Sequence, residues 1–459
     1  MDVVIVGAGV TGLTAGISLR RTGHRVTIFE RSALNNEVGA AINVPPNVGR
    51  FLLPWGLDPI RARFVSSKGM YFVSHSTFDE QSFHDHSRNT ALFGAPLYYA
   101  HRVDLHESLK RLATDPDGPG VPVKIHLKSE ATGYDSDTPS ITLSSGTVIA
   151  ADLVIAADGV HSVAVEAVLG KPNPPQPANH ANCSYRFLIP TAELDADPET
   201  RFFVHGPQAL GARIFAHPEG QRRIVSYPCR DYEVINFIGI CVDKDFISKR
   251  EDWHASVDKS KLLKAFEGFH PGLIAVMKYA LRWINDTIGP FLPRSFLMDT
   301  DSVFGKRNRK AKDIKRWPLL YRPPVPTWHR GKMALAGDAA HPMLPHHGQG
   351  GAQGMEDGLA IGLVFCSLAD RSQIEERLAI YEKVRRNRAS SIQMLSNFGF
   401  DEAVDGGVAD YLEGTAVPKN AGDMIKLAYE PDVVQRTVQL MTEFDPSFKV
   451  PEGFFATEF

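Results

Sequence analysis

The first candidate for chemistry is a glycine turn that directly follows a short β-branched strand, and it consists of Gly7, Ala8, Gly9, Val10, Thr11 and Gly12. This GxGxxG spacing at a helix start predicts a dinucleotide site. Gly7 allows the tight turn, Gly9 lets the backbone approach a pyrophosphate, and Gly12 brings the helix against the strand. Glu30 ends the next strand, where a carboxylate accepts hydrogen bonds from ribose hydroxyls. The turn alone does not distinguish NAD from FAD.

A second glycine-rich segment follows an apolar strand predicted at residues 333–336. Residues 337–358 read GDAAHPMLPHHGQGGAQGMEDG. This run resembles the flavin signature of the single-component FAD-dependent aromatic hydroxylases, the family that contains salicylate hydroxylase and 4-hydroxybenzoate hydroxylase. The resemblance extends over most of the chain. It is nearest to the salicylate hydroxylase-like members, which include fungal enzymes of natural-product biosynthesis.

The resemblance implies an α/β fold in which a Rossmann-like FAD-binding domain of the 4-hydroxybenzoate hydroxylase (GR2) type is interleaved with an antiparallel substrate domain. We predict FAD-binding segments at 1–70, 98–170 and 291–370, substrate-domain segments at 71–97 and 171–290, and a helical C-terminal region at 371–459. Within the second domain, strands are predicted at 184–190, 201–204, 212–217, 222–227 and 233–242. The polar, basic stretch at 295–312 is interpreted as a solvated, flexible loop.

The resemblance also implies which residues hold a non-covalent FAD. Asp338 would bind the ribityl chain, because a carboxylate accepts two sugar hydroxyls well. Glycines after Pro345 would lie against the isoalloxazine, whose reduced anion is stabilised by helix N-terminal amides. The cofactor-binding residues implied are Gly7, Gly9, Val10, Thr11, Gly12, Glu30, Arg31, Ala41, Arg102, Asp158, Asp338, Pro345, Gly348, Gly350, Gly351 and Ala352.

Two of these assignments carry open points. Asp158 and Gly159 match the family's DG motif, which contacts FAD and the nicotinamide nucleotide, but Val165 stands where the family has an arginine. NAD(P)H is expected as a transient electron donor, and this departure leaves its contacts open. Arg102 is predicted to contact the flavin, with a helix-start salt bridge to Asp104 or Glu107 as the alternative.

Signals for the substrate are fewer. By resemblance, Arg186 faces the flavin and orients a phenolate or carboxylate, and Tyr227 lines the same pocket, so both are predicted to be catalytic. The alternatives are a surface salt bridge for Arg186 and a core position for Tyr227. His341, His346 and His347 lack an accompanying carboxylate or thiolate pattern, so no metal site is predicted.

The composition restricts the class of partner. The chain has 459 residues, of which 43% are hydrophobic and 22% charged, with a net charge of -3. Because the chain has no excess of basic residues, its charge suggests neither nucleic acid nor membrane lipid as a partner. Four dispersed cysteines are typical of reduced thiols, and no secretory signal or membrane span is recognised. We expect a cytoplasmic monomer or homodimer.

The function implied by the resemblance is hydroxylation of a phenolic or salicylate-like molecule by FAD, NAD(P)H and O2 through a flavin hydroperoxide. One alternative is epoxidation or oxygenation of an indole or alkene in natural-product biosynthesis. A second is an FAD-binding oxidase that inserts no oxygen. The substrate, the choice of NADH or NADPH, and the oligomeric state stay open.

Overall fold

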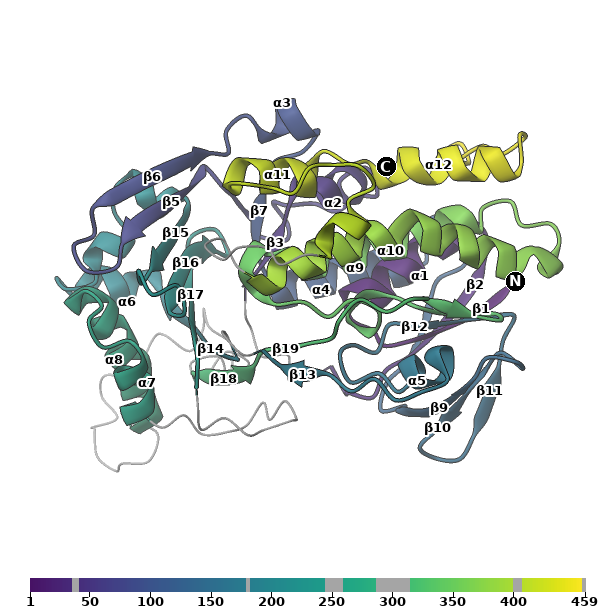
Figure 1. The fold of residues 1–459 in the computed structure, drawn as a ribbon, viewed down its shortest axis with the longest axis horizontal. Helices are drawn as coiled ribbons and strands as arrows, with labels where there is room; N and C mark the ends of the chain where they lie inside the picture. The colour runs from purple at the N-terminus through teal and green to yellow at the C-terminus, as the bar shows by residue number, and fades with distance from the viewer. Residues whose placement is uncertain (35–40, 179–181, 244–258, 286–313, 399–406, 456–459) are drawn as a thin grey trace.

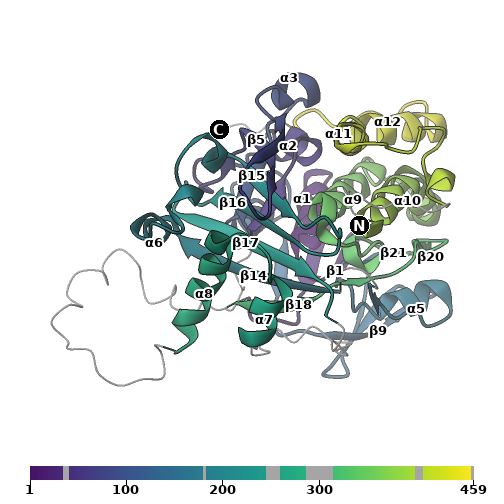
Figure 2. The same ribbon diagram turned by 60° about the vertical axis from the view of Figure 1, so that its left-hand side comes forward.

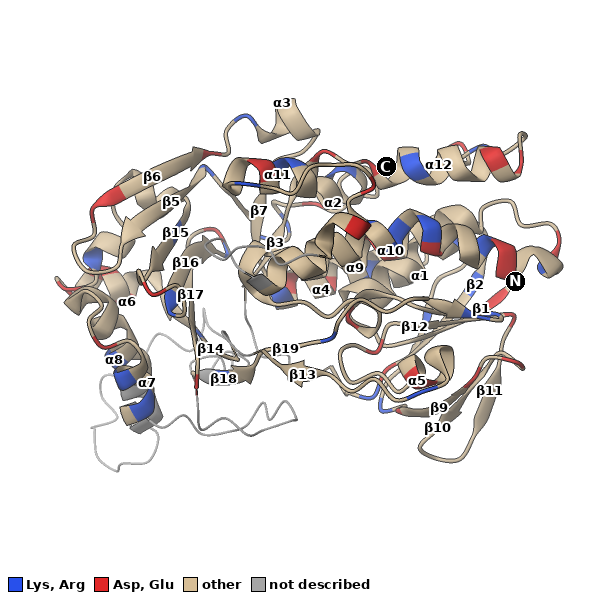
Figure 3. Ribbon diagram, in the orientation of Figure 1, with Lys and Arg blue, Asp and Glu red and all other residues tan. Residues whose placement is uncertain are grey.

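The computed structural model describes residues 1–34, 41–178, 182–243, 259–285, 314–398 and 407–455. The predicted basic loop at 295–312 lies outside these residues. Two sheets dominate the molecule, and a layer of helices covers one of them (Figure 1). Acidic and basic residues are interspersed over the helices and strands around both sheets (Figure 3).

The first sheet has six strands in the order β20-β21-β12-β1-β2-β8. These are β1 (Asp2–Val6), β2 (Arg25–Phe29), β8 (Lys124–His126), β12 (Leu153–Ala156), β20 (His329–Arg330) and β21 (Met333–Leu335). All pairs are parallel except β20 with β21. Apolar runs suit this sheet because both of its faces are buried. The parallel register brings the carboxyl ends of β1, β12 and β21 to one edge, although they are far apart in sequence.

Helices cover this sheet in two layers. The main ones are α1 (Val10–Arg21), α4 (Arg102–Thr114), α9 (Gly350–Val364) and α10 (Ile374–Phe398), and outside them lie α11 (Ala421–Tyr429) and α12 (Val433–Phe444) (Figure 2). The predicted C-terminal helical region is therefore present. No helix in the described part of the chain is both long and apolar enough to cross a membrane.

Close packing of α1 against α9 depends on glycine. Three glycines recur every four residues on α9: Gly354, Gly358 and Gly362. A Cβ on Gly354 would collide with Thr11 of α1, one on Gly358 with Thr14 and Ala15, and one on Gly362 with Ser18. This spacing keeps the three glycines on one face of the helix. The Ser18 hydroxyl donates to the Leu359 carbonyl at 3.0 Å. The helix of the first glycine motif is thereby fixed against the helix of the second.

The second sheet has seven strands in the order β18-β14-β17-β16-β15-β5-β6. Its strands are β5 (Gly69–Ser74), β6 (Glu80–Asp85), β14 (Cys183–Pro190), β15 (Ala212–Ala216), β16 (Arg223–Cys229), β17 (Val234–Cys241) and β18 (Lys315–Pro318). It is antiparallel except for the pair β5 and β15. The predicted antiparallel character is confirmed, and α7 (Lys259–Ala265) and α8 (Pro271–Asn285) lie beside this sheet (Figure 1).

The strand predicted at 201–204 is wrong, because Arg201–Phe203 form a 3-10 turn. Phe203 is fully buried, and the buried guanidinium of Arg213 donates to the carbonyls of Phe202 and Phe203. Those carbonyls are satisfied by a side chain, so this segment has no need of a neighbouring strand.

The remaining elements are short. Three small sheets contain β3 (Ala41–Val44), β4 (Val65–Ser66) and β7 (Tyr98–His101); β9 (Ala131–Asp135), β10 (Ser140–Leu143) and β11 (Val148–Ala150); and β13 (Gln176–Pro177) with β19 (Leu320–Tyr321). The short helices are α2 (Pro46–Leu52), α3 (Asn89–Phe93), α5 (Ala164–Leu169) and α6 (Thr191–Ala196). The four cysteines are free and buried. The boundaries assigned to the two domains stay a prediction.

A buried network of charges joins α9 to its surroundings. On α10, Arg385 contacts Asp357 at 2.8 Å and Glu356 at 2.5 Å, and Arg388 contacts Glu356 at 2.7 Å. Asp357 also accepts from the Gly337 amide at 2.8 Å. Burial raises the pKa of Asp357, but His341 and Arg385 outweigh that effect and hold it below its usual range. The carboxylates are therefore charged and fully paired.

Replacing Arg385 with methionine is expected to destabilise the protein strongly. Arg385→Met keeps a long side chain but leaves Glu356 and Asp357 short of a cation inside the protein, which costs roughly 3–5 kcal/mol. Urea unfolding followed by circular dichroism measures the loss. The control is Arg371→Met, which removes an exposed ion pair with Asp152 and should cost less than about 1 kcal/mol. Equal losses in the two variants would contradict the structural role of the network.

Candidate functional site

A cavity of about 430 Å³ lies where the carboxyl edge of the parallel sheet meets one face of the antiparallel sheet. Twelve of the predicted site residues line it: Gly9, Val10, Thr11, Ala41, Arg102, Arg186, Tyr227, Asp338, Pro345, Gly348, Gly350 and Gly351. Ligand cavities in proteins commonly have this size. The fold thus gathers into one place residues predicted separately for a cofactor and for a substrate.

A smaller hollow of about 110 Å³ lies beside the first glycine turn. Gly7, Glu30, Arg31 and Asp158 line it, and all four are predicted cofactor residues. The Glu30 carboxylate accepts the amides of Ala8 and Ser32, both at 2.8 Å. A carboxylate has about four acceptor positions, so Glu30 keeps acceptors for hydroxyl groups in the hollow.

Gly12 and Ala352 line neither space, although both were predicted to bind the cofactor. Both are buried just behind the lining. A Cβ on Gly12 would collide with the Gly7 carbonyl, so Gly12 allows α1 to pack closely on β1. Ala352 lies in the first turn of α9, directly after Gly350 and Gly351. In this arrangement neither residue faces a cofactor space directly. Their role in binding a cofactor stays a prediction.

Asp338 has the environment expected of a ligand-binding carboxylate. It lies in a 3-10 turn after β21, is exposed, and lines the cavity. Within the described part of the chain, no side chain or amide donates a hydrogen bond to it. Its enclosure by protein raises its pKa, and His341, Arg102 and Arg322 act in the opposite direction. A carboxylate held in this way fits the sugar-like hydroxyls of a ribityl chain.

Arg102 lies at the start of α4 and faces the same cavity. The alternative salt bridge does not form, because Asp104 pairs with Arg230 at 2.7 Å and Glu107 pairs with Lys110 at 3.0 Å. The guanidinium is instead close enough to Asp338 to influence its pKa. Arg102 therefore contributes positive charge to the cofactor side of the cavity.

Strand alternation places the predicted substrate residues on one face of the antiparallel sheet. Arg186 on β14 lines the cavity, whereas its neighbours Tyr185 and Phe187 point to the opposite face and pack in a separate apolar core. Tyr227 on β16 lines the cavity two strands away. The Arg186 guanidinium also lies 5.0 Å from the centre of the Trp317 ring, in a cation–π contact.

Tyr227 is 5% exposed, so it is buried and at the same time borders the cavity. Burial raises its pKa, which Arg186 partly offsets, so the phenol is neutral near pH 7 and can donate a hydrogen bond. Its ring stacks on that of Tyr99 with centroids 4.8 Å apart. The Tyr99 hydroxyl is within hydrogen-bond distance of Ser67 (2.7 Å) and accepts the Ala212 amide.

The histidines of the second glycine segment have partners within the protein, and two of the three line the cavity. His341 lies 2.6 Å from Asp357, and His347 lies 3.2 Å from the Leu395 carbonyl. His346 is buried at the cavity wall. In the ranges that the structure describes, no three His, Cys, Asp or Glu side chains come together in a way that could hold a metal ion.

Several lining residues were not predicted from the sequence. They are Met70 on β5, His86 directly after β6, Tyr99 on β7, and Met424, Ile425, Ala428 and Tyr429 on α11. The apolar positions of α11 recur three and four residues apart, which identifies a helix face but not what the face contacts. Arg322, whose charge lies near Asp158 and Asp338, was also missed.

Comparison with known proteins agrees with this geometry. The family profile described as "FAD binding domain" matches residues 1–183 and 308–396. An FAD-dependent monooxygenase, cfoG, of Aspergillus candidus is 42% identical over 99% of this chain and 98% of its own length. Hispidin-3-hydroxylase of Neonothopanus nambi is 31% identical over 85% of this chain and 86% of its own length.

The fold is also shared with a solved structure, a salicylate hydroxylase substrate complex, at a TM-score of 0.69 and 18% identity, covering 95% of this chain and 97% of that one. The Rossmann-like fold and the antiparallel sheet are those that the resemblance implied. The chain therefore belongs to the FAD-dependent monooxygenases that share this FAD-binding domain.

Proposed function

We propose that this enzyme hydroxylates a phenolic or salicylate-like aromatic molecule, with NAD(P)H as electron donor and O2 as oxygen source. The observation that carries the proposal is the shared cavity, in which Arg186 and Tyr227 face the glycines and the carboxylate assigned to FAD. The names of two similar proteins, hispidin-3-hydroxylase and salicylate hydroxylase, support an aromatic substrate.

The residues of the cofactor side divide the binding task between two spaces. Glu30, Arg31 and Asp158 would hold the adenosine and pyrophosphate end in the smaller hollow, next to the amide-lined turn at Gly7. Asp338 would hold the ribityl hydroxyls, and Gly350 and Gly351 would lie against the ring system at the start of α9. When bound, FAD supplies the redox chemistry that takes electrons from NAD(P)H and activates O2 for transfer of one oxygen atom.

On the substrate side, charge and hydrogen bonding would orient the ring. The Arg186 guanidinium would pair with a phenolate or carboxylate, which favours the ionised and more nucleophilic form of a phenol. The neutral Tyr227 hydroxyl would donate a hydrogen bond to the same oxygen. The apolar walls that surround these two groups would exclude water from the reaction.

Substitution of Asp338 is expected to weaken FAD binding. Asp338→Asn preserves the side-chain size but removes the charge from one or two hydrogen bonds to the ribityl chain. This loss should raise the Kd for FAD by roughly 10- to 100-fold. Titration of apoprotein with FAD, followed by flavin fluorescence, measures the constant. Asp410→Asn, at an exposed position outside both spaces, is the control. An unchanged Kd in Asp338→Asn would exclude the proposed ribityl contact.

Substitution of Arg186 is expected to weaken the binding of anionic substrates. Arg186→Met should raise the KM for salicylate by roughly 10- to 100-fold, because a charge-assisted hydrogen bond is lost, and Arg186→Lys should lie between this variant and the wild type. Initial rates of NAD(P)H oxidation measure KM. Arg201→Met, at an exposed arginine of the same region, should behave like the wild type. A larger effect of Arg201→Met would refute the assignment.

A substrate screen tests the function itself. The FAD-loaded enzyme is given NADH or NADPH with salicylate, hispidin or indole under labelled O2. Faster NAD(P)H oxidation together with a phenolic product that carries one labelled oxygen is expected. A product oxygenated at an indole or alkene bond would favour epoxidation instead. Hydrogen peroxide without an oxygenated product from any of the three would show an oxidase and refute the proposal.

A further inference from the structure

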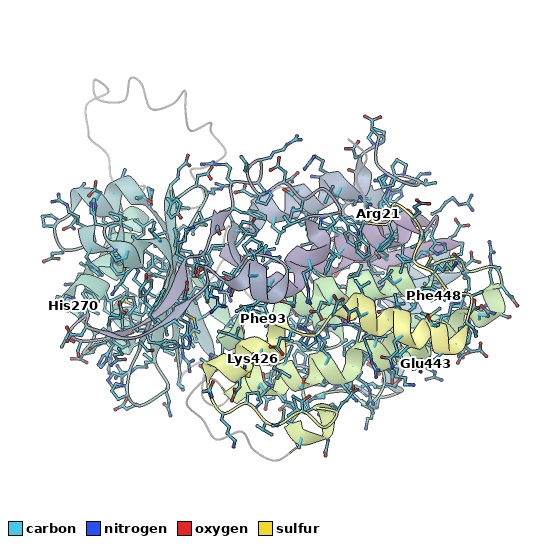
Figure 4. The ribbon with its side chains drawn as sticks, turned by 90° about the horizontal axis from the view of Figure 1, so that it is seen from above. Arg21, Phe93, His270, Lys426, Glu443 and Phe448 are labelled. Carbon is cyan, nitrogen blue, oxygen red and sulfur yellow. The ribbon has the colours of Figure 1, made fainter. Side chains whose placement is uncertain are left out.

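The C-terminal helix α11 forms a wall of the cavity. One face of α11 borders the same space as Arg186 and Tyr227. This face consists of residues at helical spacing: Ala421, Met424, Ile425, Ala428 and Tyr429. This region lies outside the part of the chain that the FAD-binding profile matches, which ends at residue 396. Figure 4 shows α11, marked by Lys426, beside the helix that carries Phe93. The wall is therefore built by a segment separate from the cofactor-binding motifs.

The position of α11 is tied to the cofactor side. Arg388 on α10 donates to the carbonyls of Leu427 at 3.1 Å and Ala428 at 2.9 Å. The same guanidinium pairs with the buried Glu356 of α9 at 2.7 Å. From α2, Arg50 donates to the Pro431 carbonyl just beyond the helix at 2.6 Å. These contacts fix the end of α11 that borders the cavity.

The inner face of α11 continues the apolar surface of the substrate sheet. Ala428 and Tyr429 are buried in one apolar cluster with Tyr99, Ala212 and Tyr227. The Tyr429 ring meets Phe93 edge to face, with centroids 5.5 Å apart. Strands, a small sheet and a C-terminal helix thus form one continuous surface around the place where a substrate ring would lie.

The Tyr429 hydroxyl is a polar group in this apolar surface. It has no hydrogen-bond partner within the residues that the structure describes, and the same holds for the Tyr227 hydroxyl. Both phenols are neutral donors because burial raises the pKa of each. Neither oxygen is among the fully enclosed, unpaired polar atoms of the described residues, so both hydroxyls keep some accessible surface. Because both residues line the cavity, a ligand oxygen there is able to accept a hydrogen bond from each hydroxyl.

We propose that Tyr429 is a substrate-binding residue and that Ala428 sets the size of substrate admitted. Tyr429 would donate a hydrogen bond to a second oxygen substituent of an aromatic substrate, in addition to the oxygen held by Arg186 and Tyr227. Ala428 is a small residue of this wall, so a larger side chain at its position would narrow the space for a substrate ring system. This inference rests on the proposed aromatic hydroxylation and specifies which part of the chain selects the substrate.

The test compares single variants of the FAD-loaded enzyme with salicylate and hispidin as probes. Tyr429→Phe should raise KM for hispidin by about 3- to 10-fold with little change in kcat, because one neutral hydrogen bond is lost. Ala428→Leu should raise KM for hispidin more than for salicylate. Tyr411→Phe, a tyrosine of the same C-terminal region that does not line the cavity, is the control and should match the wild type.

Flavin content and the Kd for FAD serve as a second readout that a general disturbance of the fold would alter. Both should be unchanged in Tyr429→Phe and Ala428→Leu. Probe binding is measured independently of turnover from the change in flavin absorbance on titration. If the wild type hydroxylates a probe but both variants keep wild-type KM and Kd values, this inference fails while the proposed function stands. A wild type that neither binds nor oxidises either probe refutes both.

Discussion

The charges buried at the centre of α9 are the constraint on which the cofactor side depends. Glu356 and Asp357 are fully enclosed carboxylates, and an enclosed charge is tolerated only where cations and hydrogen-bond donors surround it. The partners come from α10, from Asn47 on α2 and from the turn after β21. Their positions are consequently coupled, since a shift of one partner would leave a buried charge unpaired.

This network reaches two walls of the cavity. Asp357 holds the amide of Gly337, the neighbour of Asp338, and thereby places the carboxylate that faces the cofactor space. Glu356 holds Arg388, which in turn holds the carbonyls of α11. The antiparallel sheet supplies the third wall, where strand alternation turns Arg186 and Tyr227 toward the same space. The residues proposed for cofactor binding and for substrate selection are therefore held by one network of charges.

The residues predicted for the cofactor lie together around two adjoining spaces, because their pattern is local in the sequence. The turn at Gly7, the acidic residue Glu30 and the run from Gly337 to Gly351 each depend on spacing within a short segment, and Asp338 has the open, unpartnered carboxylate that its predicted role requires. Predictions that depended on distant contacts were less successful. The strand expected at 201–204 is a turn because Arg213, from another segment, donates hydrogen bonds to its carbonyls.

The sequence by itself determined the α/β class and the two glycine-rich turns, since turn geometry and helix starts are set by adjacent residues. The flavin-dependent character followed from the resemblance of residues 337–358 to a family signature. Only the tertiary structure decided what encloses the substrate space. Tyr99 and Tyr429 are separated by more than 300 residues, yet they belong to one apolar cluster with Tyr227. Such contacts arise from sheet order and from the buried charges that dock α11, and neither is encoded in the spacing of any single segment.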